Sequence, residues 1–90
     1  MIDKNDWRLQ GQEKYLMNRK IIHILFFQWS KTWDHEHCEF CSAKFSKQEN
    51  DLHKGYVTSD DKRIWICPAC YEDFKEMFNW ELIEFESSFF

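Results

Sequence analysis

The sequence contains two Cys-x-x-Cys pairs, CEFC at residues 38–41 and CPAC at residues 67–70. Two residues between paired cysteines let both sulfurs reach one metal ion at about 2.3 Å. Four sulfurs complete a tetrahedron around zinc and leave no open position, which is typical of a structural site. We therefore predict one structural Zn²⁺ per chain, held by four ligands: Cys38, Cys41, Cys67 and Cys70.

Disulfides and iron are the alternatives for these cysteines. Two disulfides would need an oxidising compartment, and the start MIDKNDWRLQ lacks the basic and then apolar segment of a secretory signal. The most apolar run, residues 21–29, is much shorter than the roughly 20 residues that span a bilayer. We therefore expect a cytoplasmic protein with reduced thiols, in which metal binding is favoured. Iron is the alternative metal, because a Cys₄ site suits it too.

The segments beside the second cysteine pair predict a β-hairpin followed by a helix. Residues 55–58 and 63–66 are rich in β-forming side chains and flank a polar turn. The second of these strands runs directly into Cys67, and Pro68 follows, a residue favoured at the first position of a helix. Aromatic residues then recur at helical spacing from Pro68 to about Asn79. The hairpin and the helix should therefore meet at the metal.

The part of the chain before the first cysteine pair predicts a long helix over about residues 11–29. Its apolar stripe consists of Tyr15, Leu16, Ile22, Leu25, Phe26 and Trp29. We expect this helix to lie across a zinc-finger core at about residues 33–80, with a short tail at residues 81–90. The 90 residues then make one small α+β domain.

Aromatic residues are abundant, with nine Phe, five Trp and three Tyr. Those expected around the metal are Trp33, Phe45, Tyr56, Trp65, Phe74 and Phe78. So small a chain can hardly bury all of them, and the group expected to supply exposed rings is Phe26, Phe27, Trp80, Phe85, Phe89 and Phe90. A contiguous exposed aromatic patch is typical of a surface that binds another protein or a second copy of the chain.

Charge argues against a nucleic-acid partner. The net charge is −4, and residues 67–90 carry one basic and six acidic side chains. A phosphate backbone repels such a chain, because binding depends on Lys and Arg displacing counterions. The alternative is a basic face on the predicted N-terminal helix, with Trp29 and Trp33 stacking on bases. Its cations would be Arg8, Lys14, Arg19, Lys20 and Lys31.

The order of these parts resembles the treble-clef zinc fingers. A Cys-x-x-Cys turn, a loop, a hairpin and a Cys-x-x-Cys at the start of a helix follow one another over about residues 33–80. The resemblance implies a fold, not an activity, because this fold serves many functions. A zinc ribbon with a third strand in place of the helix is the alternative fold. His35 and His37 flank the first pair, and we interpret them as polar surface residues.

Several further stretches carry a second resemblance: DWRL at residues 6–9, QEKYL at 12–16, WDH at 33–35, HCEFC at 37–41, WIC at 65–67 and DF at 73–74. In these the sequence is similar to a family of small uncharacterised bacterial zinc-binding proteins. The similarity implies a stand-alone bacterial zinc protein and supplies no activity.

A rubredoxin-like electron carrier is a less favoured interpretation, since rubredoxins place Gly after each cysteine pair. This chain has Ser42 and Tyr71 at those positions. An enzyme is not predicted, because four cysteine ligands leave no open metal position and the carboxylates are scattered. The sequence therefore favours a non-catalytic zinc protein that binds another protein, with no small-molecule substrate and no membrane.

Overall fold

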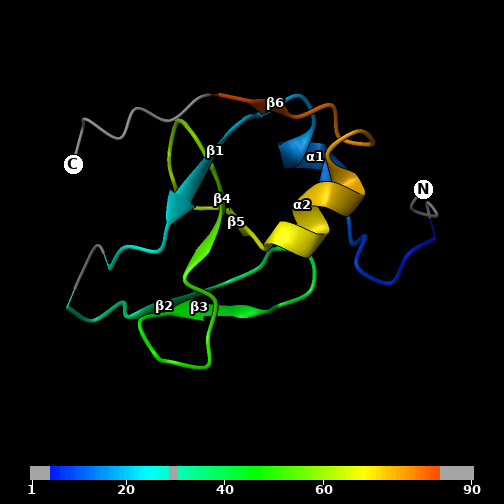
Figure 1. Cartoon of the computed structure of the whole chain (residues 1–90). Coiled ribbons are helices and arrows are strands. Elements are labelled where there is room, and N and C mark those ends of the chain that lie inside the picture. Colours follow the sequence, from blue (N-terminus) through cyan, green and yellow to red (C-terminus); the bar gives the residue numbers. More distant parts are fainter. Residues whose placement is uncertain (1–4, 29–30, 84–90) are drawn as a thin grey trace.

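The computed structural model of the chain describes residues 5–28 and 31–83. Its elements are, in chain order, α1 (Glu13–Leu16), β1 (Lys20–Leu25), β2 (His35–His37), β3 (Lys44–Ser46), β4 (Lys54–Thr58), β5 (Trp65–Ile66), α2 (Pro68–Phe74) and β6 (Glu81–Leu82). The described part is thus a small α+β arrangement, as predicted, in which strands outnumber helices (Figure 1). Neither of the two described helices has the length and apolar character needed to cross a membrane.

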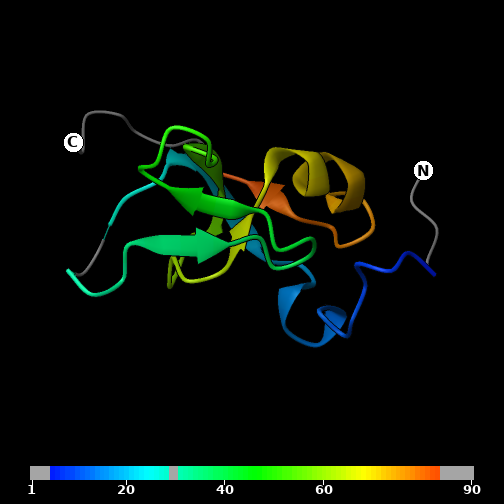
Figure 2. The ribbon, with the colours of Figure 1, turned by 90° about the horizontal axis from the view of Figure 1, so that it is seen from below.

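Four of the strands form one mixed sheet in the order β5-β4-β1-β6. Strand β4 pairs antiparallel with both β5 and β1, while the short edge strand β6 pairs parallel with β1. The register places Val57 opposite Ile22 on one side and Trp65 on the other, and all three are buried. Strands β2 and β3 form a separate hairpin below this sheet in Figure 1. Both helices lie in the right-hand half of Figure 1, and Figure 2 shows α2 in the upper part of the view and α1 in the lower part.

The predicted helix over residues 11–29 is wrong for most of its length. Helix α1 covers four residues, and the chain then turns at Asn18, whose φ is 60°. Asn tolerates this left-handed conformation because its short polar side chain can bond locally. After Arg19, six residues form β1, which buries three β-branched side chains suited to a sheet: Ile21, Ile22 and Ile24. Residue 29, the last of the predicted helix, lies outside the described residues.

The predicted hairpin at residues 55–58 and 63–66 is confirmed by β4 and β5. The predicted helix after it begins at Pro68 but ends at Phe74, five residues before Asn79. A hydrogen-bonded turn continues beyond it to Asn79, where φ is 54° and the backbone leaves the helical direction. The predicted tail starts with strand β6, whose pairing with β1 spans about 60 residues of sequence and has no local signal.

Most of the predicted aromatic core is confirmed. Phe45, Trp65, Phe74 and Phe78 are almost fully buried, and Tyr56 is half-buried. One expectation is wrong. Trp33 is 45% exposed because it lies just before β2 on the outer hairpin. Trp80, one member of the group expected to supply some exposed rings, is buried, and its Nε1 donates to the Leu16 carbonyl oxygen at 2.8 Å. Of the other rings expected to be exposed, Phe26 and Phe27 are half-buried against Trp65, and residues 85, 89 and 90 lie outside the described part.

Gly55 lets the backbone of β4 lie against the buried ring of Phe45. A Cβ at this position would lie 2.7 Å from Cζ of the fully buried Phe45 and 3.1 Å from the Ile66 carbonyl oxygen. We expect Gly55→Ala to destabilise the fold by about 1–3 kcal/mol, because Phe45 has no room to move. Lys54→Ala, at the exposed neighbouring position of β4, is the control and should change stability by less than about 0.5 kcal/mol. Chemical denaturation of the two variants and of the unchanged chain measures this. A Gly55→Ala variant as stable as Lys54→Ala would contradict the packing of Gly55 against Phe45.

Candidate metal centre

The thiols of Cys38, Cys41, Cys67 and Cys70 converge, as predicted. All four sulfurs lie within 4.8 Å of one another, and all four cysteines are free. The Cys41 and Cys67 sulfurs are 3.6 Å apart, much farther than the roughly 2.0 Å of a disulfide. Zinc–sulfur bonds of about 2.3 Å in a tetrahedron place neighbouring sulfurs about 3.8 Å apart. The four thiols therefore fit a single metal ion.

The first pair lies in the turn of the β2–β3 hairpin. Cys38 directly follows β2, and its N–H donates to the Ala43 carbonyl oxygen at 2.8 Å. The Ser42 N–H donates to the Cys38 carbonyl oxygen at 3.0 Å, and Ser42 adopts a φ of 66°. This tight turn keeps the sulfurs of Cys38 and Cys41 within reach of one ion.

The second pair lies where β5 passes into α2. Cys67 is the N-cap of α2, and its sulfur accepts a hydrogen bond from the Cys70 N–H at 3.4 Å. Pro68 occupies the first helical turn, where its missing N–H costs nothing. Two more backbone N–H groups, of Phe40 and Cys67, point at the Cys38 sulfur at 3.4 and 3.3 Å. Such donors stabilise a thiolate more than a thiol.

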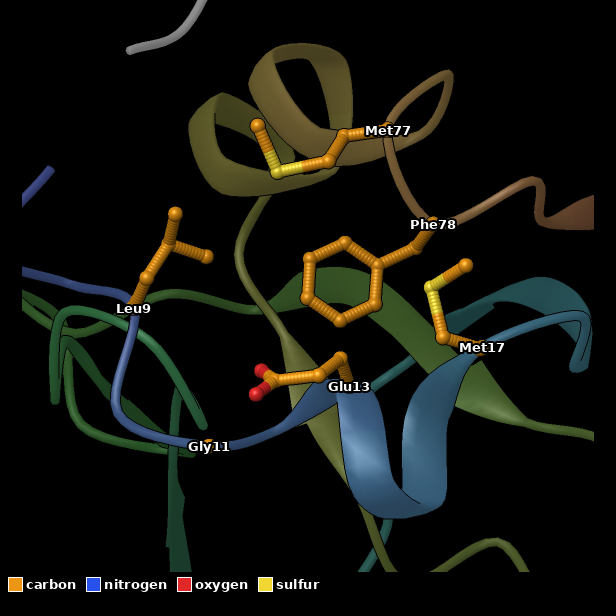
Figure 3. Close-up of a pocket in the computed structure, with 6 residues that line it drawn as sticks. All are labelled: Leu9, Gly11, Glu13, Met17, Met77 and Phe78. Carbon is orange, nitrogen blue, oxygen red and sulfur yellow. The ribbon is translucent and has the colours of Figure 1, made fainter. Parts of the chain in front are cut away.

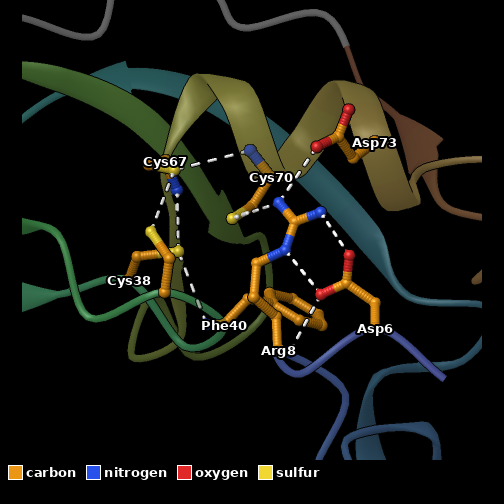
Figure 4. Close-up of polar contacts among 8 residues, drawn as sticks. Asp6, Arg8, Cys38, Phe40, Cys67, Cys70 and Asp73 are labelled. Carbon is orange, nitrogen blue, oxygen red and sulfur yellow. Dashed lines mark hydrogen bonds and ion pairs between the residues drawn. The ribbon is translucent and has the colours of Figure 1, made fainter. Parts of the chain in front are cut away.

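Arg8 lies against the cysteine cluster, a contact that sequence reasoning missed (Figure 4). Its Nη1 donates to the Cys70 sulfur at 3.4 Å and to the Asp73 carboxylate at 2.9 Å. Its Nε and Nη2 each donate to Asp6 at 2.9 Å, and the guanidinium lies 4.6 Å from the centre of the Phe74 ring. Arg8 and Cys70 are 62 positions apart, so no local pattern could reveal this pairing. The sequence suggested only that Arg8 could be one cation of a nucleic-acid-binding face.

The thiols and Arg8 change the acidity of their neighbours. The pKa of Asp6 is lowered to about 2, chiefly because the Arg8 side chain donates to its carboxylate. The pKa of Cys38 is lowered because the thiols of Cys67 and Cys70 donate to its sulfur. The pKa of Cys67 is raised to about 11, and that of Cys70 is also raised, chiefly because each hydrogen bonds to the Cys38 thiolate. The protein alone therefore stabilises a charged sulfur at Cys38, whereas ionisation of Cys67 and Cys70 calls for a cation.

His35 and His37 lie outside the group of four cysteines. Nδ1 of His35 is 2.8 Å from the Asp34 carboxylate, and Nδ1 of His37 is 3.2 Å from the Ser42 carbonyl oxygen. The exposed Trp33 stacks on His35 with ring centres 6.0 Å apart. These rings form an outer face of the β2–β3 hairpin, in agreement with the interpretation of both histidines as surface residues.

Comparison of the chain with protein-family models, with curated proteins and with solved structures found no match. The chemistry of the site therefore rests on its own geometry. In residues 5–28 and 31–83, the four cysteines are the single group of His, Cys, Asp and Glu side chains close enough together to hold a metal ion. A cluster of four thiols with backbone donors around it can bind one thiophilic cation.

Metal affinity should fall as the pH falls, because the ion replaces protons on the thiols. Near neutral pH, Cys67 and Cys70 keep their protons until metal binds, since both have raised pKa values. Release of these two protons alone should lower the logarithm of the zinc affinity by about two for each unit that the pH is lowered, and any further proton released by the ligands adds to this slope. Competition with a chromophoric chelator of known pH dependence, between about pH 8 and about pH 6, measures this slope. An affinity that does not change with pH would contradict thiolate ligation.

Proposed function

We propose that the chain is a small non-catalytic module in which one structural zinc ion holds the fold together and a neighbouring surface binds another protein. The observation that carries the structural part is the closed set of four convergent thiols. A tetrathiolate shell fills the coordination sphere of zinc and leaves no position for substrate or water. Iron would be held by the same four sulfurs, but zinc is the ion that such sites hold without redox change.

We propose a treble-clef arrangement for this unit, in preference to a zinc ribbon. The support is the order of its parts: a cysteine turn between β2 and β3, the hairpin β4–β5, and α2. The second cysteine pair spans the N-cap and first turn of that helix, where a ribbon would have a strand. Reduced thiols in a metal-binding set fit a reducing compartment, so the cytoplasm is the proposed location.

Zinc would link two segments that also pack against each other. One cysteine pair belongs to the two-stranded hairpin and the other to the junction of the four-stranded sheet with α2. Apart from the ion, the hairpin meets the rest of the structure through the Glu39 N–H, which donates to the Trp65 carbonyl oxygen at 2.8 Å. The Phe40 ring also stacks on Phe74 at 4.7 Å, and the Phe45 ring lies 5.1 Å from that of Trp65. Structural zinc contributes on the order of 10 kcal/mol, comparable to the whole net stability of a small domain.

The structure lacks, within its described residues, the long helix that the nucleic-acid alternative requires. The basic residues were expected on one helix, but Lys20 lies on β1 and Arg19 between the helix and that strand. Arg8 is paired with Asp6 and Asp73, and Arg19 lies 2.7 Å from the Asp60 carboxylate. Cations neutralised within the chain release few counterions from a phosphate backbone. We therefore favour a protein partner.

An apolar pocket beside α1 is the surface that we propose for this partner (Figure 3). It has a volume of about 310 Å³ and is lined by Leu9, Gly11, Glu13, Met17, Met77 and Phe78. In Figure 3 the Phe78 ring lies between the two methionines, which are flexible side chains that adapt to different partners. The segment that contains α1 also exposes two apolar side chains, Trp7 and Tyr15. An aromatic and methionine-rich surface of this kind is typical of a protein-binding site.

Glu13 gives the pocket a charge preference. Its carboxylate lines the pocket and makes no hydrogen bond or ion pair within the described residues. Glu76, next to Met77 in the sequence, is also exposed. The partner that fits is a peptide segment in which an apolar side chain is next to Lys or Arg. Without that cation, the Glu13 carboxylate would lose its water on binding and gain no partner in exchange.

Loss of one ligand should abolish folding. We expect Cys67→Ser to lose zinc and the near-ultraviolet dichroism of the aromatic core, because the lost metal contribution is as large as the net stability. His37→Ala, which changes an exposed residue next to the first pair, should keep one zinc per chain and the native spectrum. Dichroism and elemental analysis of both variants measure this. A folded Cys67→Ser protein in the presence of chelator would contradict the structural role of zinc.

The pocket can be tested without a known partner by selecting a random peptide library on the zinc-loaded chain. We expect the enriched peptides to carry an apolar residue beside Lys or Arg. Glu13→Lys should weaken these peptides by about tenfold or more, since it puts like charges together at the rim. Glu49→Lys, an equal charge change on an exposed loop, is the control and should leave affinity nearly unchanged. Equal losses in both variants, or no enrichment, would argue against this pocket.

A further inference from the structure

The four sulfurs of the metal centre are not equivalent in their exposure to solvent. Cys38, Cys67 and Cys70 are buried, with 3%, 5% and 1% of their surface exposed. Cys41 is half-buried, because it lies in the outer part of the β2–β3 turn. A molecule that approaches from solvent therefore meets the Cys41 sulfur first.

The sulfurs also differ in the hydrogen bonds that they accept, and the three buried ones accept more than Cys41 does. Cys38 accepts from two backbone N–H groups and Cys67 from one. Cys70 accepts from the cationic guanidinium of Arg8 at 3.4 Å. Within the part of the chain that the structure describes, the Cys41 sulfur lies 3.6 Å from the sulfur of Cys67 and accepts no hydrogen bond from an N–H group.

These donors decide how reactive a metal-bound thiolate is. A hydrogen bond withdraws electron density from the sulfur lone pairs, and a charged donor withdraws more. The sulfur without a donor keeps the most electron density, and exposure makes it accessible. Both effects favour the same atom, the Cys41 sulfur.

We propose that Cys41 is the modification site of this chain: once the metal centre is formed, its thiolate is the first to react with soft electrophiles. The inference rests on the proposed zinc site. With a maleimide, a lone pair of the Cys41 sulfur forms a bond to one alkene carbon. The π electrons move to the other carbon, which takes a proton from water. The product is a neutral thioether, so no oxidant or reductant is required.

Modification of Cys41 weakens the whole centre. A thioether carries no charge and is a poor zinc ligand, so the ion is left with three thiolates and is more easily lost to a chelator. Cys41 thereby links an electrophile in solution to the release of zinc. Arg8 protects Cys70, because its guanidinium donates to that sulfur.

The test uses zinc-loaded protein and a limiting amount of N-ethylmaleimide. After quenching, the protein is unfolded in chelator, the remaining thiols are labelled with deuterated N-ethylmaleimide, and peptide mapping gives the light-to-heavy ratio at each cysteine. We expect this ratio at Cys41 to exceed that at each buried cysteine by about tenfold or more, the effect of one charge-assisted hydrogen bond. Zinc release to a chelating dye should follow the first adduct.

The outcomes separate this inference from the proposed function. Suppose that the protein holds one zinc per chain but the label ratios of the four cysteines are equal, or a buried cysteine reacts first. That result would overturn the assignment of Cys41 and leave the zinc site unaffected. A chain without metal would overturn both. Arg8→Gln should raise the ratio at Cys70 towards that at Cys41, and Arg8→Lys should restore part of the difference. If Arg8→Gln does not fold, the wild-type ratios still decide.

Discussion

Four sulfurs within 4.8 Å of one another set the constraint on which the rest of the structure depends. Such a cluster cannot hold several negative charges without a cation, as the raised pKa values of Cys67 and Cys70 indicate. A divalent ion would turn this repulsion into attraction and link the β2–β3 hairpin to the junction of β5 with α2. Because ninety residues bury limited surface, we infer that this attraction substitutes for a larger core.

Hydrogen-bond donors reach the cysteine cluster from two parts of the chain. Backbone N–H groups supplied by the β2–β3 turn and the start of α2 point at the sulfurs. From the N-terminal side, Arg8 brings a positive charge to Cys70, and Asp6 and Asp73 hold its guanidinium in place. The face of Arg8 covers Phe74, which is fully buried. The metal centre and the aromatic core therefore share residues, and a change in one affects the other.

Local signals in the sequence predicted the local parts of the structure. The spacing of the cysteines, the β-formers on both sides of a polar turn, and Pro68 directly after Cys67 predicted the convergence of the four thiols, the hairpin and the start of α2. The helical stripe at residues 11–29 gave the wrong element, because tertiary pairing with β4 outweighs apolar spacing. The parallel β1–β6 pairing and the contact of Arg8 with Cys70 join distant residues, so neither leaves a local pattern. The fold family, zinc itself and the partner are predictions that the geometry supports.

X-ray absorption at the zinc edge tests the central claim most directly, since it reports the ligands of the bound ion in the folded chain. We predict one zinc per chain surrounded by four sulfurs at about 2.3 Å, with no nitrogen or oxygen neighbour. That result would establish a closed tetrathiolate centre. A shell that contains nitrogen or oxygen atoms, fewer than four sulfurs, or a folded chain without metal would contradict the account.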